Sequence, residues 1–226
     1  ISFTLSTYGQ SETNFPEHLL APLPEILAGK DGTFISDSIQ WEQFRRNEVL
    51  ELFRDFVYGR IPDAEVSIEP RVTYLDRNAL EGKAVMKEVE LVVTNESDSL
   101  KITILIFLPK QINGAVPLFL GLNFCGNQCI HPDPQITLPQ SWVMNNTQLG
   151  IADNKASEQS RGGRQSRWPV ELILSRGYGL ATINYGDIDP DFDDGFKNGI
   201  HGMMGLPDET RSESSWGSIA AWAWGL

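Results

Sequence analysis

The stretch GYGLATINYGDIDPDFDD, residues 177–194, decides the fold of this chain. It begins with a glycine-bounded apolar run and ends in a loop that carries five aspartates within eight residues. A helix pattern precedes it, and a tryptophan-rich helix pattern follows it. Strand, loop and helix in this order are typical of an open α/β sheet, which presents its binding site at the carboxyl ends of its strands.

The composition favours a folded protein that handles an uncharged substrate. Of the 226 residues 41% are apolar and 10% aromatic, enough for a sizeable core. The net charge of −12 argues against a nucleic acid or an anionic membrane surface as partner. No apolar run approaches the roughly 20 residues that span a bilayer. Because the chain starts at Ile1 rather than Met, we expect an earlier segment, such as a signal peptide, and a secreted or periplasmic protein.

The chain is expected to contain an arm and one domain. Residues 1–36 are punctuated by proline and glycine, which predicts an extended N-terminal arm. Residues 37–226 are predicted to form the N-terminal portion of a single domain. Within it, apolar residues recur on one helical face between residues 41 and 57, and Asp37 stands where a capping side chain is needed.

Four strands are predicted next, over residues 65–75, 85–94, 101–108 and 116–123. The turn at residues 95–98 predicts that the second and third of them pair as an antiparallel hairpin. The fourth is a short, almost wholly apolar run, which is typical of a strand buried on both faces.

The rest of the chain alternates loop, helix and strand. Residues 124–167 form a long polar excursion, and loops of this length are usually functional. A helix is expected over residues 168–177 and a buried strand over 180–184. A last helix is expected over residues 214–226, begun by capping serines. It carries no stop signal, which favours a chain that is the front part of a larger domain.

This order of elements is the first half of an α/β-hydrolase, a three-layer α/β/α sandwich. Its nucleophile sits on a sharp G-x-S-x-G turn, and no such turn occurs in the sequence. We therefore expect no catalytic residue within residues 1–226, and the serine, acid and histidine after Leu226. The loop after residue 123 is where this plan places oxyanion donors. The candidates are Phe124, Cys125, Gly126 and Asn127.

Several separated motifs carry a resemblance to a known family. They are YGRIP at 58–62, RWP at 167–169, RGYG at 176–179, YGDIDPD at 185–191, DGFKNGIH at 194–201 and WGSIAAWAWG at 216–225. Together with residues 122–127 they resemble the glucuronoyl esterases, carbohydrate esterase family fifteen. The resemblance extends over most of the chain from about residue 41. Cys125 and Cys129 depart from the bacterial members of the family.

The resemblance implies a serine esterase that cleaves the ester between glucuronic acid of xylan and lignin alcohols. It also implies two partners. One is a polysaccharide substrate, and the other is the remaining C-terminal part of the same domain. Two alternatives stay open: another carbohydrate esterase, such as an acetyl esterase, and a non-catalytic carbohydrate-binding relative on the same fold.

Two groups of residues have the composition of a metal site, but we expect neither to bind a metal. Counted from Asp189, an EF-hand loop would need glycine at position six and glutamate at twelve, where the chain has Asp194 and Ile200. Cys125, Cys129 and His131 offer three zinc ligands where a structural site needs four. No cofactor is expected.

The acidic loop is instead expected to form one wall of the cleft, with Tyr185, Asp187 and Asp189 as its candidates. Some of its carboxylates are predicted to accept backbone N–H groups or to pair with Arg161, Arg164 or Arg167. The tryptophans of the last helix are predicted to pack in the core rather than to stack on sugar rings.

Overall fold

The computed structural model describes residues 25–112, 114–205 and 211–226. The chain divides into two compact units, residues 1–51 and residues 52–226. Of the expected extended arm, residues 1–24 lie outside the described residues. Residues 25–36 form a closed turn, in which Ala28 bridges to Phe34 and the Gly29 N–H donates to the Thr33 carbonyl at 2.9 Å.

The predicted first helix is confirmed, with an irregular start. It comprises α1 (Ser38–Gln40), a π-helical turn over Trp41–Arg45 and α2 (Arg46–Phe56). The Asp37 side chain accepts a hydrogen bond from the Gln40 N–H at 2.8 Å, which satisfies one free donor of the first turn.

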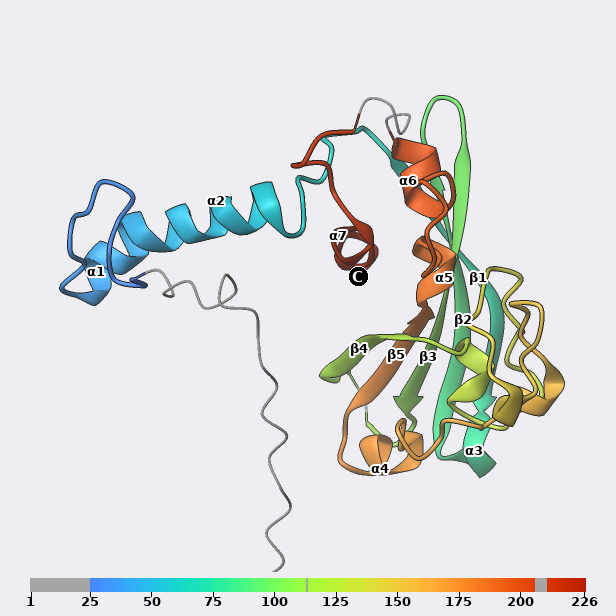
Figure 1. The fold of residues 1–226 in the computed structure, drawn as a ribbon. Helices are drawn as coiled ribbons and strands as arrows, with labels where there is room; N and C mark the ends of the chain where they lie inside the picture. The colour runs from blue at the N-terminus through green and yellow to red at the C-terminus, as the bar shows by residue number, and fades with distance from the viewer. Residues whose placement is uncertain (1–24, 113, 206–210) are drawn as a thin grey trace, which may run out of the picture. The chain divides into compact units, whose positions relative to one another are not determined.

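A five-stranded mixed sheet forms the centre of the second unit (Figure 1). Its order is β1–β2–β3–β5–β4, with bounds Ser67–Asn78, Ala84–Thr94, Ser99–Pro109, Gly179–Asn184 and Leu118–Asn123. The predicted strand at 180–184 is thus β5. It pairs antiparallel with β3 and parallel with β4, and all six of its residues are buried.

Two hairpins build the antiparallel side of the sheet. The predicted pairing of β2 with β3 is confirmed, and the Asn95 side chain holds their turn by accepting the N–H groups of Ser97 and Asp98. The β1–β2 hairpin turns through α3 (Ala79–Gly82), where Leu80 and Glu81 adopt φ of 53° and 57°. Glycine or asparagine usually fills such positions, so no turn signal was visible there.

The expectation that residues 116–123 are buried on both faces was wrong. β4 is an edge strand, and Leu118, Phe119 and Leu120 are 44%, 53% and 45% exposed. The run is apolar enough for a central strand, but only one of its edges is paired in this structure, with β5. β1, the opposite edge, carries Pro70, charged side chains and a break in register, features that discourage edge-to-edge pairing. β4 carries no charged or proline residue.

This difference predicts how the chain behaves when residues 1–226 are produced alone. We expect concentration-dependent association through β4, and Leu120→Lys should reduce it by placing a charge on that edge. Val72→Lys, on β1, is the matched control and should leave association unchanged. Light scattering after size exclusion measures both. A monodisperse wild-type chain that melts cooperatively would contradict the prediction.

The two faces of the sheet carry separate cores, which confirms the three-layer arrangement. Successive side chains of a strand point to opposite faces. On β3, Leu105 and Phe107 belong to one cluster, whereas Ile102 and Ile104 belong to the other. The first face is covered by Val170 and Leu174 of α4 (Val170–Ser175) and by Ile130 and Ile136 of the excursion. The second is covered by residues from 188–221, namely Ile188, Ile200, Met203, Trp216, Ala220 and Ala221.

Three short helices cover this second face. They are α5 (Tyr185–Ile188), α6 (Gly199–Met204) and α7 (Ser218–Trp224). The first falls at the start of the acidic stretch expected to be loop, and no element was predicted for the second. The last helix was predicted, but the expectation that serines cap it was wrong, because its N-cap is Gly217. Ser214 lies in a turn instead, Ser215 bridges to Arg60, and the Gly217 N–H donates to the Tyr58 carbonyl at 3.0 Å.

Candidate active site

The candidate site lies where the parallel strands β4 and β5 end. Their last residues, Asn123 and Asn184, are paired in register and buried. The Asn123 amide donates to the Thr182 hydroxyl at 2.9 Å and to the Asn127 side-chain oxygen at 2.7 Å. The sequence analysis did not predict this buried polar layer. The pattern that could have indicated it is that both apolar runs end in asparagine.

Asn127 fixes the oxyanion loop to the sheet through β3. Its side-chain N–H donates to the Thr103 carbonyl at 3.0 Å. The Thr103 N–H in turn donates to Asp187 at 3.0 Å. β5 pairs with β3 only as far as Ile104. The Asn127 and Asp187 side chains therefore satisfy the carbonyl and N–H groups of Thr103, which have no partner on β5. The loop after β4 and the stretch after β5 therefore bind the same residue.

Asp187 is a buried carboxylate with three donors. Besides Thr103, it accepts the Ser141 hydroxyl and, at 3.3 Å, the Asn184 amide. Burial raises the pKa of Asp187 above its usual value, and the hydrogen bond from Ser141 is the largest opposing influence. Asp187 therefore ties together β3, β5 and the excursion.

Asp189 binds a histidine inside the second core. Its carboxylate lies 2.8 Å from the His201 Nδ1, and its carbonyl accepts the Trp222 indole N–H at 2.8 Å. The His201 ring is fully buried and packs edge-on against Trp216, with ring centroids 4.8 Å apart. This pair joins α5, α6 and α7. It lies in the core.

Tyr185 lies at the centre of an aromatic cluster. Its ring centroid is 4.9 Å from Phe124, 5.6 Å from Trp222 and 5.9 Å from Trp142. Burial raises the pKa of Tyr185. The three predicted wall residues, Tyr185, Asp187 and Asp189, are therefore all buried: they support the site from behind and do not line its pocket. The packing of Trp216 and Trp222 agrees with the prediction for these tryptophans.

Two of the four oxyanion candidates, Phe124 and Cys125, line a pocket of about 290 Å³. The other two, Gly126 and Asn127, follow them directly in the chain. The walls of the pocket are Leu122, Asn123, Phe124, Cys125, Cys129, Ile130, Arg164, Arg167 and Trp168. Gly126 adopts a φ of 87°, a conformation suited to glycine, and Asn127 begins a 3₁₀ turn. Among the described residues, the backbone N–H groups of Phe124, Cys125 and Gly126 donate to no protein acceptor. Such N–H groups can stabilise a developing oxyanion.

Cys125 and Cys129 are free thiols in contact with each other. The Cys129 thiol is buried and donates to the Cys125 carbonyl at 3.0 Å, while Cys125 is half-buried. The hydrogen bond from the Cys129 thiol, followed by one from Arg164, lowers the pKa of Cys125 to about 6. The same contact and burial raise the pKa of Cys129. Cys125 is therefore the reactive thiol of the two.

A lowered pKa makes the reactivity of Cys125 measurable as a pH profile. The thiolate is the attacking form, so alkylation by iodoacetamide should accelerate as pH rises through about 6 and level off above it. An ordinary thiol would still be accelerating near pH ~8.5. Arg164→Gln removes a positive neighbour and should move the midpoint upward. A wild-type midpoint near ~8.5, the pKa of an ordinary thiol, would contradict the lowered pKa of Cys125.

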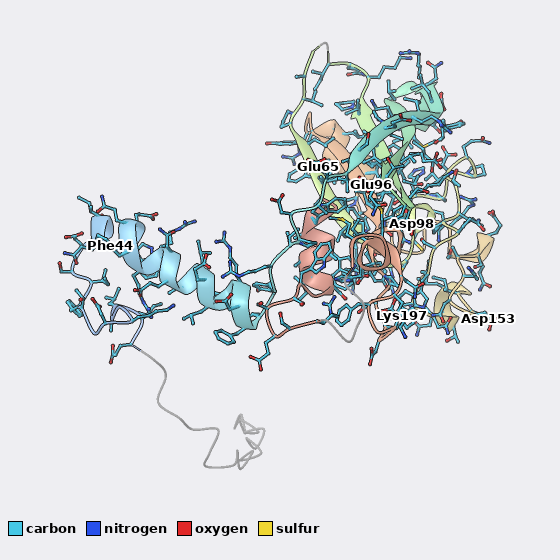
Figure 2. All side chains as sticks on the ribbon, turned by 90° about the horizontal axis from the view of Figure 1, so that it is seen from above. Phe44, Glu65, Glu96, Asp98, Asp153 and Lys197 are labelled. Carbon is cyan, nitrogen blue, oxygen red and sulfur yellow. The ribbon has the colours of Figure 1, made fainter. Side chains whose placement is uncertain are left out.

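The remaining polar side chains of the region have structural roles. Asp194 accepts the backbone N–H groups of Phe196 and Asn198, as predicted for this loop. Arg161 pairs with Glu158 rather than with the acidic loop. Figure 2 labels Asp153, which lies in a turn of the excursion, and Lys197, which follows the acidic stretch.

Two further findings concern metals and membranes. Within residues 25–112, 114–205 and 211–226, no three histidine, cysteine, aspartate or glutamate side chains cluster as metal ligands would. In the same ranges no helix has the length and apolar character needed to cross a bilayer.

Comparison with known proteins shows which of them this chain resembles. No family model matches the chain. A protein named carbohydrate esterase MZ0003, from an unknown prokaryotic organism, is 42% identical over 220 residues, which are 97% of this chain and 50% of that protein.

Two solved structures agree with it. One, a promiscuous CE15 esterase from a marine bacterial metagenome, has a TM-score of 0.75 and 42% identity, covering 90% of this chain and 51% of that one. The other, a glucuronoyl esterase from Solibacter usitatus, has a TM-score of 0.78 and 37% identity, covering 91% and 51%. By sequence and by its α/β-hydrolase fold, the chain is similar to carbohydrate esterases of family 15 and spans about half the length of those it matches.

Proposed function

We propose that this chain forms one half of a serine-type ester hydrolase. Its substrate would be the 4-O-methyl-glucuronoyl ester that links xylan to lignin alcohols. The observation that carries the proposal is the match, over nine tenths of the chain, to a structure described as a glucuronoyl esterase. Because such a substrate is a cell-wall polymer, a secreted or periplasmic location forms part of the proposal.

The proposed chemistry divides between this chain and the rest of the protein. A serine located after Leu226 would attack the ester carbonyl, with a histidine and a carboxylate from the same region as its base and orienting group. The attack forms a tetrahedral oxyanion. The N–H groups of residues 124–127 would contribute to its stabilisation, because those of Phe124, Cys125 and Gly126 donate to no acceptor in the described part of the chain and Asn127 holds the loop in place.

The fold supports this division. The outer edge of β4 is apolar, uncharged and unpaired among the described strands. A further parallel strand from the rest of the protein would bury Leu118, Phe119 and Leu120. It would also bring its own carboxyl end beside Asn123, next to the pocket, which is where α/β sheets place reacting groups.

A second candidate, an esterase of broader or acetyl-type specificity, is favoured by one observation. One of the two similar structures is described as a promiscuous CE15 esterase. The kcat/KM of the full-length protein for a methyl glucuronate ester, acetylated xylan and a simple acyl ester would separate the two. Preference for the uronate ester supports the first proposal. Activity on acetylated xylan alone supports the second, and no turnover of any ester favours a non-catalytic relative.

A further inference from the structure

The two cysteines of the pocket are built as a reactive pair. Cys125 faces the pocket, half-buried, whereas Cys129 is 1% exposed in a small core with Val143 and Ile151. The Cys129 sulfur lies 3.0 Å from the Cys125 carbonyl oxygen, and the two residues pack in the same cluster. Both line the pocket, but Cys125 has the more exposed side chain and is therefore the one that meets a solute first.

The surroundings fix this pair in place. Gly126 provides the turn, closed by the Cys129 N–H, which donates to the Gly126 carbonyl at 3.0 Å. The buried Gln128 amide donates to the Cys125 carbonyl at 2.8 Å and to the Ser160 hydroxyl at 2.9 Å. The cationic side chains of Arg164 and Arg167 line the same pocket as Cys125. An accessible sulfur near cationic side chains, with a second thiol beside it, is the arrangement of redox-sensing cysteines.

We propose that Cys125 and Cys129 form a hydroperoxide-sensitive dithiol, with Cys125 as the attacking sulfur and Cys129 as the resolving one. In the first step the Cys125 thiolate attacks one oxygen of the hydroperoxide, an S–O bond forms and the O–O bond breaks. The departing alkoxide or hydroxide takes up a proton, and Cys125 is left as a sulfenic acid. The thiolate supplies both electrons that reduce the peroxide.

In the second step Cys129 attacks the Cys125 sulfur. An S–S bond forms, the S–O bond breaks, and the leaving hydroxide takes the Cys129 proton and departs as water. The sulfurs must close to about 2.05 Å, which requires only a local movement because the two residues pack in one small cluster and the Cys129 sulfur lies 3.0 Å from the Cys125 carbonyl oxygen. A disulfide across so short a loop gains little from chain entropy, so a dithiol reductant should reverse it.

The sequence makes the test direct. No lysine or arginine lies between residues 111 and 154, so trypsin leaves both cysteines on the single peptide 111–155. The full-length protein is reduced, exposed to hydrogen peroxide, alkylated and digested. We expect this peptide to lose two hydrogens and take up no alkyl group, and to regain two alkylatable thiols after treatment with dithiothreitol.

Matched variants assign the two roles. Cys129→Ser should stop at the sulfenic acid, which dimedone captures on Cys125. Cys125→Ser should leave Cys129 at least tenfold slower to oxidise, because that sulfur is buried. Arg164→Lys keeps the fold and the charge and should retain disulfide formation. If Cys129→Ser does not fold, the wild-type peptide still decides the matter.

Two results would overturn the proposal: a wild-type peptide that keeps two free thiols under peroxide, or one that accumulates the sulfenic acid without closing the disulfide. The readout is a thiol mass and needs no ester substrate. Its failure is therefore distinct from failure of the proposed esterase function.

Discussion

Gly126→Ala in the full-length protein should lower kcat/KM for a uronate ester about 100-fold, the size of effect expected when oxyanion donors are displaced. Gly126 adopts a φ of 87°, which strains any residue with a Cβ. That Cβ would collide with the Gln128 side chain and lie 2.8 Å from the Pro139 Cγ. Relieving the collision moves the N–H groups of residues 124–127, so kcat should fall more than KM rises.

Gly82→Ala separates this effect from backbone strain alone. Gly82 has a φ of 83°, close to that of Gly126, but a Cβ there meets nothing within 4 Å. It lies in the β1–β2 turn, away from the pocket. We expect a modest loss of stability and unchanged kcat/KM. Equal activity of the two variants would show that the loop after β4 has no part in catalysis.

Gly186→Ala should destabilise the full-length protein by about 3 kcal/mol, the upper end of what overpacking usually costs. Gly186 stands in α5, between Tyr185 and Asp187. A Cβ there would collide with the backbone oxygen of Trp142, and neither backbone can rotate away as a side chain could. The collision separates the acidic stretch from the excursion, which also breaks the contact of Asp187 with Ser141.

The matched control for Gly186 is Gly217→Ala. A Cβ on Gly217 meets nothing within 4 Å, and the residue caps α7 in an extended conformation. Its replacement should cost about 1 kcal/mol or less, because glycine is the better N-cap residue but no side-chain hydrogen bond is lost. Urea denaturation of both variants measures the difference. A Gly186→Ala protein as stable as the control would mean that α5 and the excursion are not packed as described.

Local patterns were sufficient to predict the elements whose stability is decided locally. The strand patterns of residues 85–94 and 101–108, with the turn at residues 95–98, predicted the β2–β3 hairpin. The apolar run that ends at Asn184 predicted β5. Asp37 predicted the start of the first helix, and Gly177 the end of α4.

Features that depend on distant partners could not be predicted in this way. The sequence of β4 is typical of a central strand, and only the pairing of the five strands shows that β5 is its single partner within this structure. Ser215 reads as a helix cap, but its bridge to Arg60, which lies 155 residues earlier, holds it extended. For the same reason the site could not be predicted: Thr103 is contacted by Asn127 and Asp187, which follow it by 24 and 84 residues.

The central claim is that this chain supports serine-type hydrolysis of a uronate ester, and one measurement tests it most directly. The full-length protein and its serine-to-alanine variant, with the serine taken from the G-x-S-x-G-type turn expected after Leu226, are assayed on a methyl glucuronate ester. The account predicts turnover by the wild type and a loss of several orders of magnitude in the variant. Turnover that is equal in the two proteins, or absent from both, would contradict it.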